Sequence, residues 1–139
     1  LKVNQKKAKN NFKKYLITPE QEFVEAHSFL AIVENKEIPS LKSLKVSEEA
    51  YVLGLLDCIG ELKRFVLDNI RNGQLKKADR IFNVMENLYQ ALYPFAMYDK
   101  IVKETRRKLD VNRILVEETR AVITEEIRRN HFVKALTKK

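Results

Sequence analysis

The 139 residues suffice for one domain with a single modest core, and a charged fraction of 33% with only three Gly and three Pro favours an all-α fold. One cysteine, Cys58, excludes an internal disulfide and predicts a reducing, cytoplasmic location, while no apolar run reaches the roughly 18 to 20 residues of a membrane span. The net charge of +8 is concentrated at the two ends, with six Lys and no acid in residues 1–16, which suits a polyanionic partner such as nucleic acid.

The first 46 residues predict two helices and a loop. Apolar residues at positions 1, 8, 12, 15 and 16 predict an amphipathic helix over residues 1–16. Thr18-Pro19-Glu20-Gln21 has the pattern of a capping box with Pro at the first helical position, so a second helix is predicted from there to about Lys36. Residues 37–46 are predicted to form a loop. Because the chain begins inside a helical pattern, an N-terminal helical segment is expected to be missing.

Three further helices are predicted. Ser47 is expected to cap a helix that ends at Asn72-Gly73. The next helix spans residues 74–92, and residues 95–130 predict a single helix of about 35 residues. A helix this long exceeds so small a core, so we expect it to pack against another subunit. The apolar face of the fourth helix consists of Ala78, Ile81, Phe82, Met85, Leu88, Tyr89 and Leu92.

Two pairs of acidic residues are the most informative feature. Glu22 and Glu25 are spaced i, i+3, and Asp57 and Glu61 are spaced i, i+4, so each pair faces one way on a helix. Both pairs lie among apolar residues, where a carboxylate needs a cation, a proton or a hydrogen-bond donor. If the four carboxylates converge, their oxygens form a site for a hard divalent metal such as Mg²⁺.

The third helix places its polar residues on one narrow stripe. At 100° per residue, Asp57, Glu61, Arg64 and Asp68 fall within an arc of about 60°, and Gly54 and Gly60 flank this arc. Glycine costs helix stability, so backbone or ligand is expected to approach closely there. The alternative is a solvated face with a Glu61–Arg64 ion pair.

Other kinds of active site fit the sequence less well. A di-iron bundle needs Glu-x-x-His, and neither His27 nor His131 has Glu three residues earlier. An all-α nucleoside-triphosphate pyrophosphohydrolase also holds Mg²⁺ with paired acids on two helices, and it remains an alternative. No phosphate-binding Gly-rich loop, Zn-spaced Cys/His set or nucleophile elbow is present. Cys58 is predicted to belong to the core.

Two stretches resemble the translin superfamily, and within it the branch of translin-associated factor X. QEFVEAHSF resembles that branch's Q-E-[YF]-[VI]-E-A-x-[ST]-F helix, and AYVLGLLDCIGELKR resembles its D-Y-x-x-G-x-x-D-x-x-G-E-L-x-R helix. NIRNG resembles the stop that follows, and the likeness covers roughly residues 19–130. Ala50 departs from the pattern, which has Asp there, and the family's N-terminal helical segment is missing or reduced to residues 1–16.

The resemblance implies a single translin-like domain over residues 1–139, an antiparallel bundle of about five helices. It implies an Mg²⁺-dependent endoribonuclease, with Mn²⁺ as a substitute, which cleaves single-stranded RNA inside an octameric homo-oligomer. Translin-type subunits lack the acids corresponding to Glu22, Glu25 and Asp57, so their presence here favours the nuclease branch. By this resemblance Glu25, Asp57 and Glu61 would ligate the metal, and Glu22 would ligate it or position the attacking water.

Three arginines are candidates for contacts with RNA: Arg64, Arg106 and Arg113. Arg64 is expected to act mainly as a clamp on a carboxylate. Arg106 and Arg113 have acids four residues later, so intrahelical ion pairs are an equally good prediction for them. A translin-like shell that binds single-stranded RNA or DNA without cleaving it remains the principal alternative function.

Overall fold

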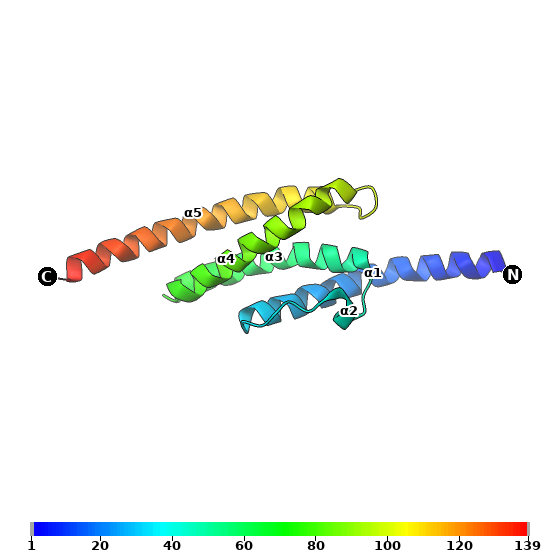
Figure 1. Ribbon diagram of the computed structural model, residues 1–139, viewed down its shortest axis with the longest axis horizontal. Coiled ribbons are helices and arrows are strands. Elements are labelled where there is room, and N and C mark those ends of the chain that lie inside the picture. Colours follow the sequence, from blue (N-terminus) through cyan, green and yellow to red (C-terminus); the bar gives the residue numbers. More distant parts are fainter. Residues whose placement is uncertain (1, 139) are drawn as a thin grey trace. The chain divides into compact units, whose positions relative to one another are not determined.

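The computed structural model describes the backbone of residues 2–138 and the side chains of residues 17–138. Within this part of the chain there is no strand, so the predicted all-α fold with a long C-terminal helix is confirmed. None of these helices is long and apolar enough to cross a membrane. The elements are α1 (Lys2–Val33), α2 (Leu41–Leu44), α3 (Glu48–Arg71), α4 (Leu75–Leu92), the 3-10 helix η1 (Tyr93–Tyr98) and α5 (Thr105–Thr137) (Figure 1).

The chain divides into two compact units, and the boundary between them in the sequence falls within α3. The N-terminal unit extends to Cys58 and the C-terminal unit begins at Ile59. In the N-terminal unit, α1 and the first part of α3 run in the same direction, because the connection between them returns along α1 (Figure 1). In the C-terminal unit, the end of α3, then α4, then α5 alternate in direction. Of the two predicted pairs of acids, Glu22 and Glu25 lie on α1, and Asp57 and Glu61 lie on α3.

The predicted helix boundary at Thr18–Gln21 is wrong, because α1 continues through Pro19. A proline inside a helix removes one backbone hydrogen bond and costs roughly 3 kcal/mol. The residues that looked like a cap instead contact α3. A Glu20 carboxylate oxygen accepts hydrogen bonds from the backbone N–H of Ser47 at 3.1 Å and from its hydroxyl at 2.8 Å. The stripe predicted over residues 1–16 lies outside the described side chains.

The predicted start and end of α3 are confirmed. The Ser47 hydroxyl oxygen accepts a hydrogen bond from the Ala50 N–H at 3.3 Å, which satisfies one of the free donors of the first turn. The helix ends at Arg71, and Gly73 follows with φ +70, a left-handed conformation that glycine adopts without strain. Asn72-Gly73 therefore stops the helix as predicted.

The predicted loop over residues 37–46 contains one short helix, α2. Ser40 caps it, because its hydroxyl oxygen accepts a hydrogen bond from the Ser43 N–H at 3.2 Å. The Tyr51 hydroxyl donates to the Pro39 carbonyl oxygen at 2.9 Å and fixes this connection to α3. Burial raises the pKa of the Tyr51 phenol above its ordinary value.

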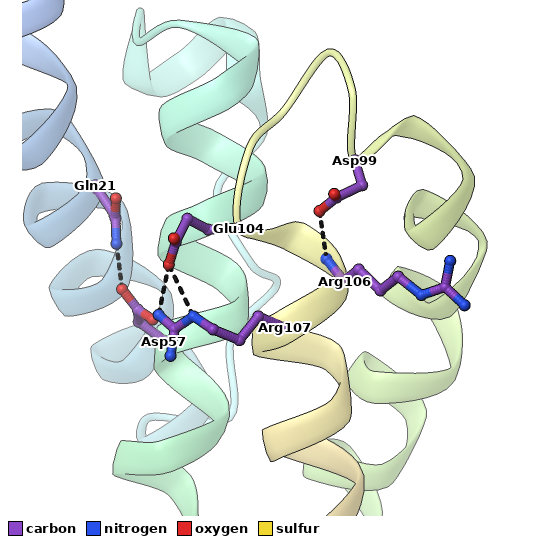
Figure 2. Close-up of polar contacts among 6 residues, drawn as sticks. All are labelled: Gln21, Asp57, Asp99, Glu104, Arg106 and Arg107. Carbon is purple, nitrogen blue, oxygen red and sulfur yellow. Dashed lines mark hydrogen bonds and ion pairs between the residues drawn. The ribbon is translucent and has the colours of Figure 1, made fainter.

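The predicted start of the last helix is wrong by about ten residues. Residues 93–98 form η1, and the N–H groups of Ile101 and Val102 both donate to the Tyr98 carbonyl oxygen at 2.8 Å. Glu104 then takes φ 74, which interrupts the helical path before α5 begins. An Asp99 carboxylate oxygen accepts from the Arg106 N–H at 2.9 Å and caps α5 from upstream (Figure 2).

The core of the C-terminal unit follows the predicted faces. The apolar face of α4 is buried as predicted, except that Tyr89 is only half-buried. On α5, the side chains of residues 131–138 are all exposed, so the helix extends beyond its buried face as expected. The buried residues of α5 are Thr105, Leu109, Asn112, Val116, Thr119 and Ile123.

Candidate active site

The N-terminal unit contains an unusually close contact between α1 and α3, and Gly54 makes it possible. A methyl group at Gly54 would lie 2.6 Å from the Gln21 carbonyl oxygen and 2.7 Å from the Val24 Cβ. Real side chains do not approach a backbone oxygen so closely, so only glycine fits here without movement of the helices. The close approach expected at this position is therefore confirmed.

The same contact brings Gln21 to Asp57. The Gln21 side-chain amide donates a hydrogen bond to an Asp57 carboxylate oxygen, and Figure 2 shows the two side chains pointing at each other across the two helices. Asp57 is half-buried, so this donor offsets part of the cost of removing the carboxylate from water. Sequence reasoning placed Gln21 in a helix cap and missed this role.

The two acids of α1 have different environments. Glu25 lies one turn after Gln21, so it is on the side of α1 from which Gln21 reaches Asp57, and it is half-buried. Glu22 is exposed, and at 100° per residue it faces about 160° away from the buried Val24. Glu25 therefore lies beside the contact with α3, whereas Glu22 lies farther round the helix.

Glu61 follows Asp57 by one turn of α3 and belongs to the C-terminal unit. Its carboxylate lies 3.8 Å from an Arg64 guanidinium nitrogen, the i, i+3 ion pair that was expected, with the Arg64 side chain 76% exposed. Gly60 differs from Gly54, because a methyl group there would meet only the Leu115 side chain at 4.0 Å. The close approach predicted at Gly60 does not occur within the described chain.

The donor chemistry of the four carboxylates fits a hard divalent cation, since Mg²⁺ prefers oxygen ligands. Among the side chains of residues 17–138, however, no three His, Cys, Asp or Glu are gathered closely enough to hold a metal ion. Asp57 instead turns one oxygen to Gln21. The arrangement thus provides Glu22 and Glu25 on α1 and Asp57 and Glu61 on α3.

The remaining candidate side chains lie elsewhere. Cys58 is fully buried, as predicted for a core residue. His27 is exposed and packs against Phe23, with ring centroids 4.0 Å apart, so it is not directed at the carboxylates. His131 is exposed near the end of α5, as expected.

The arginines of α5 do not form the predicted i, i+4 pairs. Arg106 and Arg113 are exposed, and within residues 17–138 neither guanidinium has a carboxylate at ion-pair distance. Arg120 differs, because it forms an ion pair with Glu86 of α4. Burial raises the pKa of the Tyr89 phenol, and the charge of nearby Arg113 partly offsets that effect. Arg106 and Arg113 therefore remain available to an anionic partner.

An all-α chain that presents unpaired arginines on the long helix α5 is a candidate nucleic-acid-binding protein. The family model of the translin family matches residues 2–123, which is most of the sequence. The chain belongs to the translin family. This agrees with the resemblance found in the two motifs around Glu22 and Asp57.

Individual relatives extend the comparison. The chain is 47% identical over 106 residues to the uncharacterized protein MJ0175 of Methanocaldococcus jannaschii, a match that covers 76% of this chain and 47% of that protein. It is similar to the crystal structure of AfC3PO, with 32% identity, a TM-score of 0.77 and coverage of 92% and 68% of the two chains. It is also similar to the AfC3PO–duplex RNA complex, with 33% identity, a TM-score of 0.71 and coverage of 79% and 58%. The chain thus spans about half the length of the curated relative it matches.

Proposed function

We propose that this chain is a subunit of a metal-dependent endoribonuclease that cleaves single-stranded RNA within a homo-oligomer. The observation that carries the proposal is the contact at Gly54, where α1 approaches α3 closely enough for Gln21 to bond to Asp57. Glu25 lies one turn from Gln21 and Glu61 one turn from Asp57, so each helix supplies one further carboxylate next to the Gln21–Asp57 pair. Membership of the translin family and similarity to a protein solved with duplex RNA support RNA as the class of substrate.

Each residue of the site has a proposed role. Glu25, Asp57 and Glu61 would hold Mg²⁺ or Mn²⁺, and Glu22 would complete the ligand set or position the attacking water. A bound divalent ion supplies polarisation of the phosphoryl oxygens and a lower pKa for water. Gln21 is a positioning residue, because its amide orients one oxygen of Asp57.

Two features of α5 support the remaining partners. The exposed guanidiniums of Arg106 and Arg113 would contact the RNA backbone, since phosphate contacts from Arg and Lys provide much of the affinity for nucleic acids. The end of α5 exposes Phe132 and Leu136, at 65% and 60%, which is consistent with packing against another subunit. We therefore propose that the oligomer forms partly through this end of α5.

A non-catalytic RNA-binding shell is the second candidate. It is favoured by the absence, among residues 17–138, of three carboxylates within reach of one metal ion, and by the exposure of Glu22. In that case the Gln21–Asp57 hydrogen bond would serve only the packing of α1 on α3.

A cleavage assay on the purified oligomer separates these functions. A labelled single-stranded RNA, a labelled duplex RNA and free nucleoside triphosphates are incubated with Mg²⁺ or with EDTA. We expect internal cleavage of the single-stranded RNA that requires Mg²⁺ and stops in EDTA. Binding of RNA without EDTA-sensitive cleavage would establish the shell, and release of pyrophosphate from nucleotides would establish the pyrophosphohydrolase.

A further inference from the structure

A groove lies at the end of the C-terminal unit, where α3 turns into α4 and the last turns of α5 pass by. Its main hollow has a volume of about 640 Å³ and is lined by six residues of the turn and α4 between Gly73 and Asp79 and by Ile127, Asn130, His131 and Lys134 of α5. A second hollow of about 370 Å³ shares Gly73, Leu75, Asn130 and Lys134 with the first. We call the two together the α4–α5 groove.

The α4–α5 groove is lined by net positive charge, to which the second hollow adds only the Glu126–Arg129 ion pair, with no net charge. Its main hollow has three lysines, Lys76, Lys77 and Lys134, against one acid, Asp79. The Lys77 ammonium lies 5.0 Å from the centre of the Phe65 ring. Within the described part of the chain, neither Lys76 nor Lys134 has a carboxylate at ion-pair distance. Two ammonium groups from different helices therefore border one hollow without a counter-ion.

The start of α4 adds hydrogen-bond donors to the same place. Gln74 precedes the helix and makes no side-chain hydrogen bond to its first turn. The first N–H groups of a helix have no partner within the helix, and they favour anions. The donors and the lysines together suit an anion with several oxygens, as a phosphate group has.

The shape of the groove favours a chain of phosphates over a single one. Its two hollows are adjacent and share four lining residues. The lining has no Phe, Tyr or Trp on which a base could stack. Lys recognises phosphate as a point charge, without reading sequence. These features suit a nucleic-acid backbone whose bases point away from the groove.

We propose that the α4–α5 groove binds backbone phosphates of single-stranded RNA through Lys76 and Lys134. This inference rests on the proposed RNA substrate. It adds a phosphate contact on the C-terminal unit that is separate from Arg106 and Arg113 of α5. Lys134 and the rest of the α5 lining lie beyond residues 2–123, the part of the chain that matches the family model.

The main hollow of the groove and the apolar end of α5 use different sides of that helix. At 100° per residue, Ile127, His131 and Lys134 extend the buried stripe that ends at Ile123, within an arc of about 80°. Phe132 and Leu136 face more than about 100° away from these residues. Packing of another subunit on the apolar side therefore leaves the main hollow, with Lys76 and Lys134, open to RNA.

The test measures how binding depends on salt, with the Lys76→Ala/Lys134→Ala double variant of the full chain. Fluorescence anisotropy of a labelled oligouridylate is recorded in EDTA over a series of NaCl concentrations, so cleavage makes no contribution. Each phosphate contact with a single strand contributes about 0.7 to the slope of log K against log salt, so we expect the slope to become shallower by about 1.4. Both lysines are exposed, so the fold should be unaffected.

The control is Lys100→Ala/Lys103→Ala, which removes two exposed lysines from the other end of the C-terminal unit. An unchanged slope in the Lys76/Lys134 variant, or an equal change in the control, would overturn the proposal even if the protein cleaves RNA. A selective change would support it even if no RNA is cleaved. Direct binding of inorganic pyrophosphate that depends on the two lysines, without any binding of RNA, would also overturn it.

Discussion

Replacing Asp57 by Asn is expected to lower the rate of RNA cleavage by about 100-fold or more and to leave RNA affinity nearly unchanged. The substitution removes one charged oxygen ligand from the proposed site. Mutation of groups that only support the ligands of a metal already lowers metal affinity or activity by about 10- to 100-fold. Asn keeps the size of Asp57 and can still accept the hydrogen bond from Gln21. Initial cleavage rates in excess Mg²⁺, with anisotropy for binding, give both quantities.

Asp68→Asn is the matched control for this prediction. Asp68 lies on α3, is exposed and is outside the four proposed acids, so its replacement makes the same chemical change without touching the site. Glu25→Gln should behave like Asp57→Asn. Wild-type cleavage by Asp57→Asn, or equal losses in the Asp57 and Asp68 variants, would mean that the carboxylate of Asp57 has no part in the reaction.

Gly54→Ala is expected to destabilise the protein by about 1–3 kcal/mol, the usual cost of forcing an extra methyl group into a closely packed region. The new Cβ would lie 2.6 Å from a backbone oxygen of α1, so the helices must separate. Because that contact also holds Gln21 to Asp57, the variant should lose cleavage activity as well. Urea unfolding followed by far-UV circular dichroism gives the free energy of unfolding.

Gly60→Ala is the control on the same helix. A methyl group there meets one side-chain carbon at 4.0 Å, an ordinary contact. Alanine in a helix interior is more stable than glycine by about 0.5–1 kcal/mol, so this variant should be more stable than the wild type. If Gly54→Ala were as stable as the wild type or, like Gly60→Ala, more stable, the close contact between α1 and α3 at Gly54 would be disproved.

The parts of the fold that sequence predicted well are those set by local chemistry. Ser47 caps α3, Gly73 ends it and Pro94 follows the end of α4, because hydroxyl caps, left-handed glycine and proline act within a few residues. The start of α5 could not be predicted in this way. The interruption falls on Glu104, which adopts φ 74. Glutamate rarely takes a left-handed conformation, so the residue type at this position does not predict the interruption.

The candidate site was only partly predictable for the same reason. The spacing of Asp57 and Glu61 placed both on one side of α3, since this depends only on helical geometry. The cap-like pattern of Thr18–Gln21 led to a wrong prediction for Gln21, because this residue bonds to Asp57, which is 36 positions away in the sequence. Its role could have been inferred from its position one turn before Glu25 on the side of α1 that meets α3. Which carboxylates share a metal depends on side-chain rotamers, and spacing does not determine those.

Direct metal binding tests the central claim of the account, that the carboxylates of α1 and α3 form a divalent-cation site. Mn²⁺ is titrated into the oligomer of the wild type, Asp57→Asn and Asp68→Asn. Binding is followed as loss of the electron paramagnetic resonance signal of free Mn²⁺. We predict saturable binding that Mg²⁺ displaces, retained in Asp68→Asn and strongly weakened in Asp57→Asn. Equal Mn²⁺ binding by all three proteins, or no saturable binding by the wild type, would contradict the proposed metal site.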